Sequence, residues 1–205
     1  MIDPPGDHPL PHPELNSQTP LVFKLQPGDL LYRHHQSIHH PIYFGTTGNN
    51  RFDDPTCTTG AAFGVLYVGA DPHCSFIESC GSTTGVPAVS GAYLANREVA
   101  KLELTEELLF VDLASPGGLT HIGADARLMS GSYKIAQRWS AALRVHPVKP
   151  AGIRYLSRHD PTRVAYAIYT RPPSTFVVSS LGSLMAASNS GLLNQLLRDY
   201  NVDLI

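Results

Sequence analysis

Residues 63–81 read FGVLYVGADPHCSFIESCG, and this stretch contains a strand, a turn and a helix in direct succession. Its first half is rich in β-branched and aromatic residues, which is typical of a buried strand. Asp71 then suits the N-cap of a helix, and Pro72 suits the first helical position. Gly81 can end the helix. The pattern therefore predicts a strand that leads directly into a short helix over 72–80.

The segments on either side of this unit also divide into short strands and helices. Strand-like runs outnumber helical ones, the helices are spread among the strands, and no internal repeat occurs. This mixture predicts an α+β (mixed α/β) fold. We expect strands on both sides of a turn within 21–33 and within 97–113, and over 151–157, 163–170 and 174–180; helices over 132–146 and 192–200; and loops over 41–63, 81–92 and 114–131.

Length and composition describe one globular domain. The chain has 205 residues, of which 42% are hydrophobic and 16% are charged, and one hydrophobic core can serve a chain of this size. The net charge of -2 lacks the basic excess that nonspecific nucleic-acid binding needs, so no direct nucleic-acid partner is predicted. Residues 1–20 are rich in proline and poor in apolar side chains, which predicts an extended, mobile segment outside the core. The domain is expected to span 21–205.

Cysteine content and hydropathy indicate a cytoplasmic protein. Cys57, Cys74 and Cys80 are odd in number and form no CxxC pair, so a reducing compartment fits better than a disulfide framework. The first residues have neither the basic start nor the apolar run of a signal peptide. No apolar run reaches the about 20 residues that span a bilayer, so no membrane segment is predicted.

Four histidines, His34, His35, His39 and His40, lie close together in the sequence. A zinc site commonly takes four ligands from two elements at short spacings. Adjacent residues of a strand point to opposite faces, however, so at most one histidine of each pair could join a common site. Neither CxxC nor HExxH supports zinc binding. A polar segment that is rich in histidine is the favoured interpretation, and no metal is predicted.

Two charged residues leave a choice open. Arg33 ends the apolar run 29–33. Its side chain either lies in solvent or lies at the rim of a sheet, where the planar guanidinium group can bind a phosphate or carboxylate. Glu78 shares a helical face with Cys74 and Ser75, and it lies either on an exposed edge or in a pocket that a ligand completes. No GxxxxGK[ST], GxGxxG or GxSxG motif occurs that would name the ligand.

Four short blocks are the most specific pattern in the chain: LYR at 31–33, NRFDDP at 50–55, FGVLYVGADPHCSFIES at 63–79 and AGIRYLSRHDP at 151–161. Together and in this order they resemble the RES-domain family, which is named for its arginine, glutamate and serine. Its best-known members are toxins of bacterial RES–Xre toxin–antitoxin pairs. The resemblance covers residues 25–175.

The resemblance implies a fold similar to that of the NAD-using ADP-ribosyltransferases, with central twisted sheets flanked by helices. It also implies NAD as the substrate, because characterised RES proteins destroy NAD by hydrolysis or by transfer to phosphate. His34, next to the family arginine, is a further candidate contact, and Ser132 and Ser140 are rivals of Ser157 for the family serine. Residue by residue, the match assigns Arg33, Tyr67, Glu78 and Ser157 to catalysis, and Arg33, Arg51 and Tyr67 to contacts with NAD.

The implied chemistry suits these residue types. Arg33, together with Arg51, would hold the pyrophosphate of NAD. Glu78 would stabilise positive charge on the ribose as the nicotinamide leaves, hold a ribose hydroxyl, or polarise the attacking water or phosphate. Tyr67 and Ser157 would orient the nicotinamide end of the substrate. The expected function is therefore an NAD glycohydrolase or phosphorylase that is toxic through NAD depletion.

Two alternatives use the same pocket. A mono-ADP-ribosyltransferase would modify a protein, and a catalytically inactive module would only bind the nucleotide. An Xre-type antitoxin and a second copy of the chain are candidate partners. The sequence departs from the family pattern at His34, where some members have an aromatic residue, at the apparent expansions 81–100 and 112–131, and at the additional 1–20 segment. These departures leave substrate preference and partner open.

Overall fold

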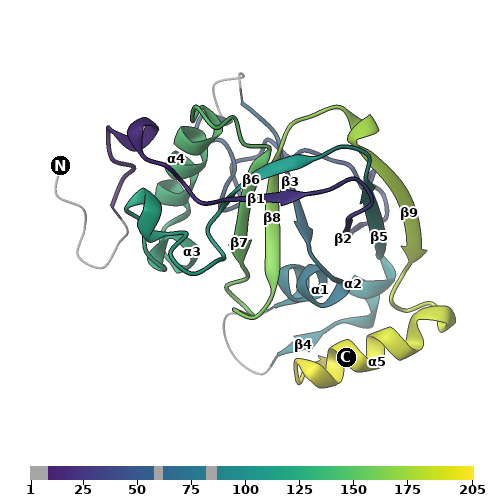
Figure 1. Cartoon of the computed structure of the whole chain (residues 1–205). Helices are drawn as coiled ribbons and strands as arrows, with labels where there is room; N and C mark the ends of the chain where they lie inside the picture. The colour runs from purple at the N-terminus through teal and green to yellow at the C-terminus, as the bar shows by residue number, and fades with distance from the viewer. Residues whose placement is uncertain (1–8, 58–61, 82–86) are drawn as a thin grey trace.

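A computed structural model describes residues 9–57, 62–81 and 87–205 and has an eight-stranded curled sheet at its centre (Figure 1). One neighbouring pair, β6 (Leu108–Asp112) with β7 (Gly152–Leu156), is parallel, and the other pairs of this sheet are antiparallel. The α+β prediction is confirmed. In order across the sheet, the strands are β1 (Val22–Leu25), β6, β7, β8 (Val164–Tyr169), β3 (Val65–Gly69), β2 (Leu30–Gln36), β5 (Arg97–Leu104) and β9 (Phe176–Gly182).

Helices and a small second sheet surround the central sheet. The small sheet pairs β4 (Ala88–Val89) in parallel with β10 (Asp203–Leu204). The helices α3 and α4 lie on the side of β7, and α5 lies beside β4 near the C-terminus (Figure 1). The helices are α1 (Pro72–Cys80), α2 (Gly91–Ala95), α3 (Arg127–Ser130), α4 (Tyr133–Arg144) and α5 (Ser190–Asp199), with the 3-10 helices η1 (Leu15–Ser17), η3 (Thr120–Ile122), η4 (Pro173–Thr175) and η5 (Ala187–Asn189).

The strand, turn and helix predicted within 63–81 form β3 and α1. The Asp71 carboxylate accepts a hydrogen bond from the backbone N–H of Cys74 at 2.8 Å, and Gly81 ends the helix. Gly69, the last residue of β3, allows the helix to pack directly against the strand. A Cβ atom on Gly69 would lie 2.7 Å from the Cys74 Cβ and from the backbone nitrogen of Ser75, which is closer than non-bonded atoms approach.

The sheet opens between β2 and β3. Strand β2 pairs with β5 along its whole length, but it meets β3 at one register position, Tyr32 opposite Gly69. Strand β3 instead pairs with β8 over its full length. Residues Arg33 and His34 of β2 and Tyr67 of β3 therefore flank an opening in the sheet, and helix α1 packs against both strands.

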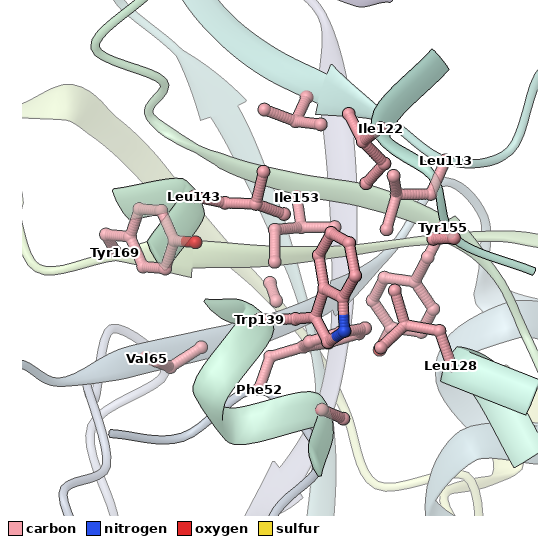
Figure 2. Close-up of a cluster of buried hydrophobic side chains, with 14 of the residues drawn as sticks. Phe52, Val65, Leu113, Ile122, Leu128, Trp139, Leu143, Ile153, Tyr155 and Tyr169 are labelled. Carbon is pink, nitrogen blue, oxygen red and sulfur yellow. The ribbon is translucent and has the colours of Figure 1, made fainter. Parts of the chain in front are cut away.

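A large core cluster lies between the sheet and α4 (Figure 2). Trp139 of α4 packs with Ile153 and Tyr155 of β7, and Phe52 contacts Tyr155 edge to face with 5.0 Å between the ring centroids. Phe52 belongs to the predicted loop 41–63, so this loop is attached to the core at its middle. Residues 58–61 of the loop lie outside the described ranges.

The predicted loop 114–131 contains η3 and α3, whose residues Ile122 and Leu128 are buried in the same cluster (Figure 2). In the described part of 81–92, β4 and the first residues of α2 replace the expected loop. Loop predictions failed here because short helices and two-residue strands carry too little periodicity to be recognised from sequence. Whether 81–100 and 112–131 are expansions stays a prediction.

The expectation that residues 1–20 lie outside the core is wrong for the described part. Leu15 is 3% exposed and packs into the core cluster around α4. The indole N–H of Trp139 donates to the carbonyl oxygen of Pro9 at 2.9 Å, and the His146 Nε2 lies 3.2 Å from the carbonyl oxygen of Leu15. This segment is fixed by partners far along the chain, which proline content does not reveal.

Candidate active site

A cavity of about 290 Å³ lies beside the opening between β2 and β3. Strands β2, β3 and β7 and helix α1 contribute to its walls, together with the segments around Arg51 and Tyr133. Five of the residues assigned from sequence line it: Arg33, His34, Arg51, Tyr67 and Glu78.

Arg33 extends from β2 into a largely buried position. One terminal nitrogen, Nη1, donates to the carbonyl oxygen of Pro41 at 2.5 Å. Burial lowers the pKa of Arg33 to about 10, and nearby Tyr43 opposes this shift. The side chain therefore remains a cation at neutral pH, and no carboxylate in the described part of the chain forms an ion pair with it. Its second terminal nitrogen is available to a ligand.

Arg51 is held more rigidly and is 8% exposed. Its Nη1 donates to the carbonyl oxygens of Leu128 and Gly131 at 3.1 and 3.0 Å, and its guanidinium carbon lies 4.5 Å from the centroid of the Tyr133 ring. Nη2 is buried and has no partner among the residues that the structure describes. Burial lowers the pKa of Arg51. A buried donor without an acceptor is costly, which is the property expected of a ligand-binding group.

Tyr67 presents its ring rather than its hydroxyl to the cavity. The hydroxyl donates to Asp53 Oδ1 at 2.9 Å and accepts from the backbone N–H of Phe52 at 2.9 Å. Burial, reinforced by the Asp53 carboxylate, raises the pKa of Tyr67 well above its usual range. The hydroxyl is therefore occupied in holding the 50–55 segment, next to Arg51, and the aromatic face is free to stack on a ligand.

Glu78 and Ser157 meet in a short hydrogen bond. The Ser157 hydroxyl donates to Glu78 Oε1 at 2.5 Å and accepts from the backbone N–H groups of His159 and Asp160 at 3.2 and 3.3 Å. Ser157 is 1% exposed and lies behind the carboxylate, whereas Glu78 is exposed at the cavity. The serine fixes one carboxylate oxygen, and Oε2 is left for a ligand. Glu78 therefore lines the cavity while its side chain remains exposed to solvent.

A model of the RES domain matches residues 30–184. The chain belongs to the RES domain family. The matched range spans β2 to β9 and includes every residue of the described ranges that lines the cavity. The family predicted from the four sequence blocks is therefore confirmed.

Two known proteins are similar to this RES domain. "Probable toxin y4kH" of Sinorhizobium fredii (strain NBRC 101917 / NGR234) is 31% identical over 115 residues, which cover 56% of this chain and 87% of that protein. A chain in the crystal structure of the M. tuberculosis MbcT-MbcA toxin-antitoxin complex matches with a TM-score of 0.56 and 15% identity, covering 84% of this chain and 91% of that chain. At 15% identity, this structural similarity supports a similar fold and nothing further.

The rival serines of the RES domain lie elsewhere. The Ser140 hydroxyl donates to the carbonyl oxygen of Phe52 at 2.7 Å within the core, and Ser140 does not line the cavity. Ser132 precedes α4 and is also absent from the described cavity wall. The Ser157 hydroxyl, by contrast, donates to Glu78 Oε1.

His34, where this RES domain departs from the family pattern, is 6% exposed and is fixed by Ser79. The His34 Nδ1 lies 2.6 Å from the Ser79 hydroxyl, which itself donates to a backbone carbonyl of α1. Nε2 is buried and has no hydrogen-bond partner in the described ranges. Burial, reinforced by Arg97 and His35, lowers the pKa of His34 to about 3, so the ring is neutral.

Several cavity residues of the RES domain were not predicted. Arg158 and His159 directly follow Ser157 in the fourth block, so their proximity to the site was available from the sequence. Tyr133 and Met129 carry no such signal, because the fold of 114–133 alone brings them to the cavity. Asn50, beside Arg51, is a further lining residue.

The described residues contain no group of three or more His, Cys, Asp or Glu side chains that could hold a metal ion. His34 lines the cavity, whereas the His35 Nδ1 lies 2.9 Å from the backbone oxygen of Gln36 and His39 stacks on Tyr43. Over the same ranges, none of the helices has the length and apolar character needed to cross a membrane.

Proposed function

We propose that this RES-domain protein consumes NAD by cleaving its nicotinamide–ribose bond. The observation that carries the proposal is the Glu78 carboxylate, held by Ser157 at a cavity whose described walls contain three arginines and one carboxylate. A cationic cavity with a single fixed carboxylate suits a substrate that carries phosphate at one point and develops positive charge at another.

The arginines supply the binding part of this chemistry. The pyrophosphate of NAD is anionic, and guanidinium groups match phosphate oxygens with paired hydrogen bonds. Arg33 and Arg51 both have nitrogen atoms that are free of protein partners in the described ranges. A cavity of about 290 Å³ is small for a whole dinucleotide, so the enclosed part would take the nicotinamide riboside end while the adenosine extends outward.

Glu78 supplies the catalytic part. When the bond between ribose C1′ and the nicotinamide nitrogen breaks, its electron pair leaves with nicotinamide, which becomes neutral, and positive charge develops on the ribose. The Glu78 carboxylate would stabilise this charge, which is often the largest catalytic term. An acceptor oxygen then bonds to C1′ and loses its proton if the acceptor is water. The Tyr67 ring would stack on the nicotinamide, and Ser157 would keep the carboxylate in position.

The similar proteins support a role as the toxin of a toxin–antitoxin pair. One relative is named a probable toxin, and the similar structure is a toxin–antitoxin complex. We expect expression of the wild-type chain to arrest bacterial growth and lower cellular NAD, and expression of Glu78→Gln to do neither. The physiological partner would then be an antitoxin protein that suppresses the arrest.

The decisive experiment measures NAD loss and nicotinamide release by the purified protein, with and without inorganic phosphate and cell extract. Glu78→Gln keeps the shape of the side chain and removes its charge, so NAD consumption should fall by about 100-fold or more. Glu103→Gln is the matched control, because Glu103 is an exposed carboxylate on β5 that does not line the cavity.

The outcomes separate the candidate functions. Dependence of NAD loss on phosphate would identify phosphate as the acceptor. A mass gain on proteins of the cell extract would identify a protein as the acceptor. NAD binding without nicotinamide release would identify an inactive binding module. If Glu78→Gln were as active as Glu103→Gln, the catalytic assignment of Glu78 would be wrong.

A further inference from the structure

Arg158 and Arg51 meet at the same tyrosine. The guanidinium carbon of Arg51 lies 4.5 Å, and that of Arg158 lies 5.8 Å, from the centroid of the Tyr133 ring. Both distances are within the range of cation–π contacts. All three residues line the cavity. We call Arg51, Tyr133 and Arg158 the arginine stack.

The two positive charges of the arginine stack are not balanced by the protein. Neither guanidinium forms an ion pair with a carboxylate in the described part of the chain. Glu78 is the one carboxylate among the described lining residues, and Ser157 occupies one of its oxygens. Burial lowers the pKa of Arg51, Tyr133 opposes this shift, and Arg158 lowers the pKa further. Like charges that converge on one aromatic ring repel each other. An anion between them would relieve this repulsion.

The free donors of the stack suit such an anion. Arg51 is more than nine-tenths buried, with Nη1 engaged by two carbonyl oxygens and Nη2 buried without a partner in the described ranges. The Nε of Arg158 donates to His159 Nε2 at 3.1 Å, which orients the guanidinium and leaves its two terminal nitrogens available. Two oriented guanidinium groups with unused N–H donors match the several acceptor oxygens of a phosphate group.

We propose that the arginine stack is a binding site for a phosphate group of the ligand, and that Arg158 is a substrate-binding residue. The ligand class is a phosphate ester or pyrophosphate, recognised through its charge and oxygen atoms rather than through its base. With the proposed function, on which this assignment of the natural ligand rests, the occupant is one phosphate of the NAD pyrophosphate, while Arg33 holds the other. The phosphate site itself can be tested without turnover.

The test is calorimetric titration of the full chain with inorganic pyrophosphate and with ADP-ribose, neither of which contains the bond to be cleaved. Replacing Arg158 by alanine should weaken the binding of both probes by about tenfold or more, as expected for the loss of a charge-assisted contact. Nicotinamide, which has neither a phosphate nor the bond to be cleaved, should bind equally to the wild type and to Arg158→Ala. The control is Arg138→Ala, since Arg138 is exposed on α4 and does not line the cavity.

The results separate this inference from the proposed function. Loss of pyrophosphate binding in Arg158→Ala, without any NAD consumption by the wild type, would keep the phosphate site and reject the enzyme. NAD consumption by the wild type together with equal pyrophosphate binding by Arg158→Ala would keep the enzyme and overturn the phosphate site. Failure of the wild type to bind pyrophosphate would also overturn it. Arg158 is exposed, so thermal unfolding of the variant should match that of the wild type.

Discussion

Replacing Tyr67 by phenylalanine removes one oxygen atom and tests whether this tyrosine acts through its hydroxyl or through its ring. The hydroxyl donates to Asp53 Oδ1 at 2.9 Å and accepts from the backbone N–H of Phe52 at 2.9 Å. Asp53 is 0% exposed and also accepts from the backbone and side-chain N–H groups of Asn50. The substitution therefore leaves a buried carboxylate and a buried N–H each short of one partner.

The expected magnitude follows from these two contacts. A hydrogen bond to a charged group contributes about 1.5–3 kcal/mol, and a buried donor left without an acceptor costs about 1–3 kcal/mol. Together they predict a loss of about 2.5–6 kcal/mol in the free energy of unfolding. For a domain of this size each kcal/mol lowers Tm by about 2–4 °C, so Tm should fall by roughly 5–24 °C.

The assay compares thermal and denaturant unfolding of Tyr67→Phe with the wild type. Tyr43→Phe is the control for loss of an exposed hydroxyl, because Tyr43 is 48% exposed and forms no hydrogen bond through its hydroxyl in the described ranges. Phosphate binding should also weaken in Tyr67→Phe, since Phe52 and Asp53 position the adjacent Arg51. Under the proposed function, kcat at saturating NAD should stay within about tenfold of the wild type, because the ring is retained.

One result would refute this reasoning. If Tyr67→Phe unfolded within about 0.5 kcal/mol of the wild type and yet consumed no NAD, the hydroxyl would act in the chemistry rather than in the structure. The assignment of the ring as the ligand-facing part of Tyr67 would then be wrong.

Two further predictions concern the residues around Glu78 and His34. Ser157→Ala should lower kcat by about 10- to 100-fold with a smaller change in KM, because misplacing a catalytic group slows the chemical step. Steady-state kinetics of the variant and the wild type measure both constants. An unchanged kcat would show that Ser157 does not position Glu78. His34 has a pKa of about 3 in the folded protein against an ordinary value of 6.5. As the pH falls, the histidine is therefore protonated in the unfolded chain at a higher pH than in the folded protein. Its neutral form is fully stabilising above pH 6.5, and each pH unit below 6.5 towards 3 should lower the free energy of unfolding by about 1.4 kcal/mol. In His34→Gln this slope should be reduced across the window, and equal slopes in both proteins would contradict the burial of a neutral histidine.

Local signals predicted the elements of this fold well where all the interactions that form them lie within a few residues. The α1 helix is the clearest case, because its cap, its first-turn proline and its terminal glycine act within one short segment. The strands within 21–33 and 97–113 were also predictable, but their partners were not. Strand β1 pairs with β6, and β2 pairs with β5. These pairings could not be predicted because they join segments that are distant in sequence.

The prediction for the N-terminal segment was wrong because its packing also depends on residues that are distant in sequence. Its prolines and polar residues are typical of a mobile lead-in, yet Leu15 is buried because α4 and the loops around it provide a hydrophobic surface to cover it. Composition measures how much apolar surface a segment carries. It does not measure whether another part of the chain is shaped to receive the few apolar residues present.

By itself, the sequence determined the α+β class, the helix and strand around Glu78 and, through four ordered blocks, membership of the RES domain family. Only the tertiary structure decided that Ser157 rather than Ser140 holds Glu78, that the Tyr67 hydroxyl is occupied within the protein, and that Arg158 joins Arg51 at Tyr133. The physical reason is that residue type and local spacing follow from neighbouring positions. A side chain's partners and exposure, by contrast, depend on segments that meet only when the sheet opens beside α1 and the 114–133 region folds over the cavity.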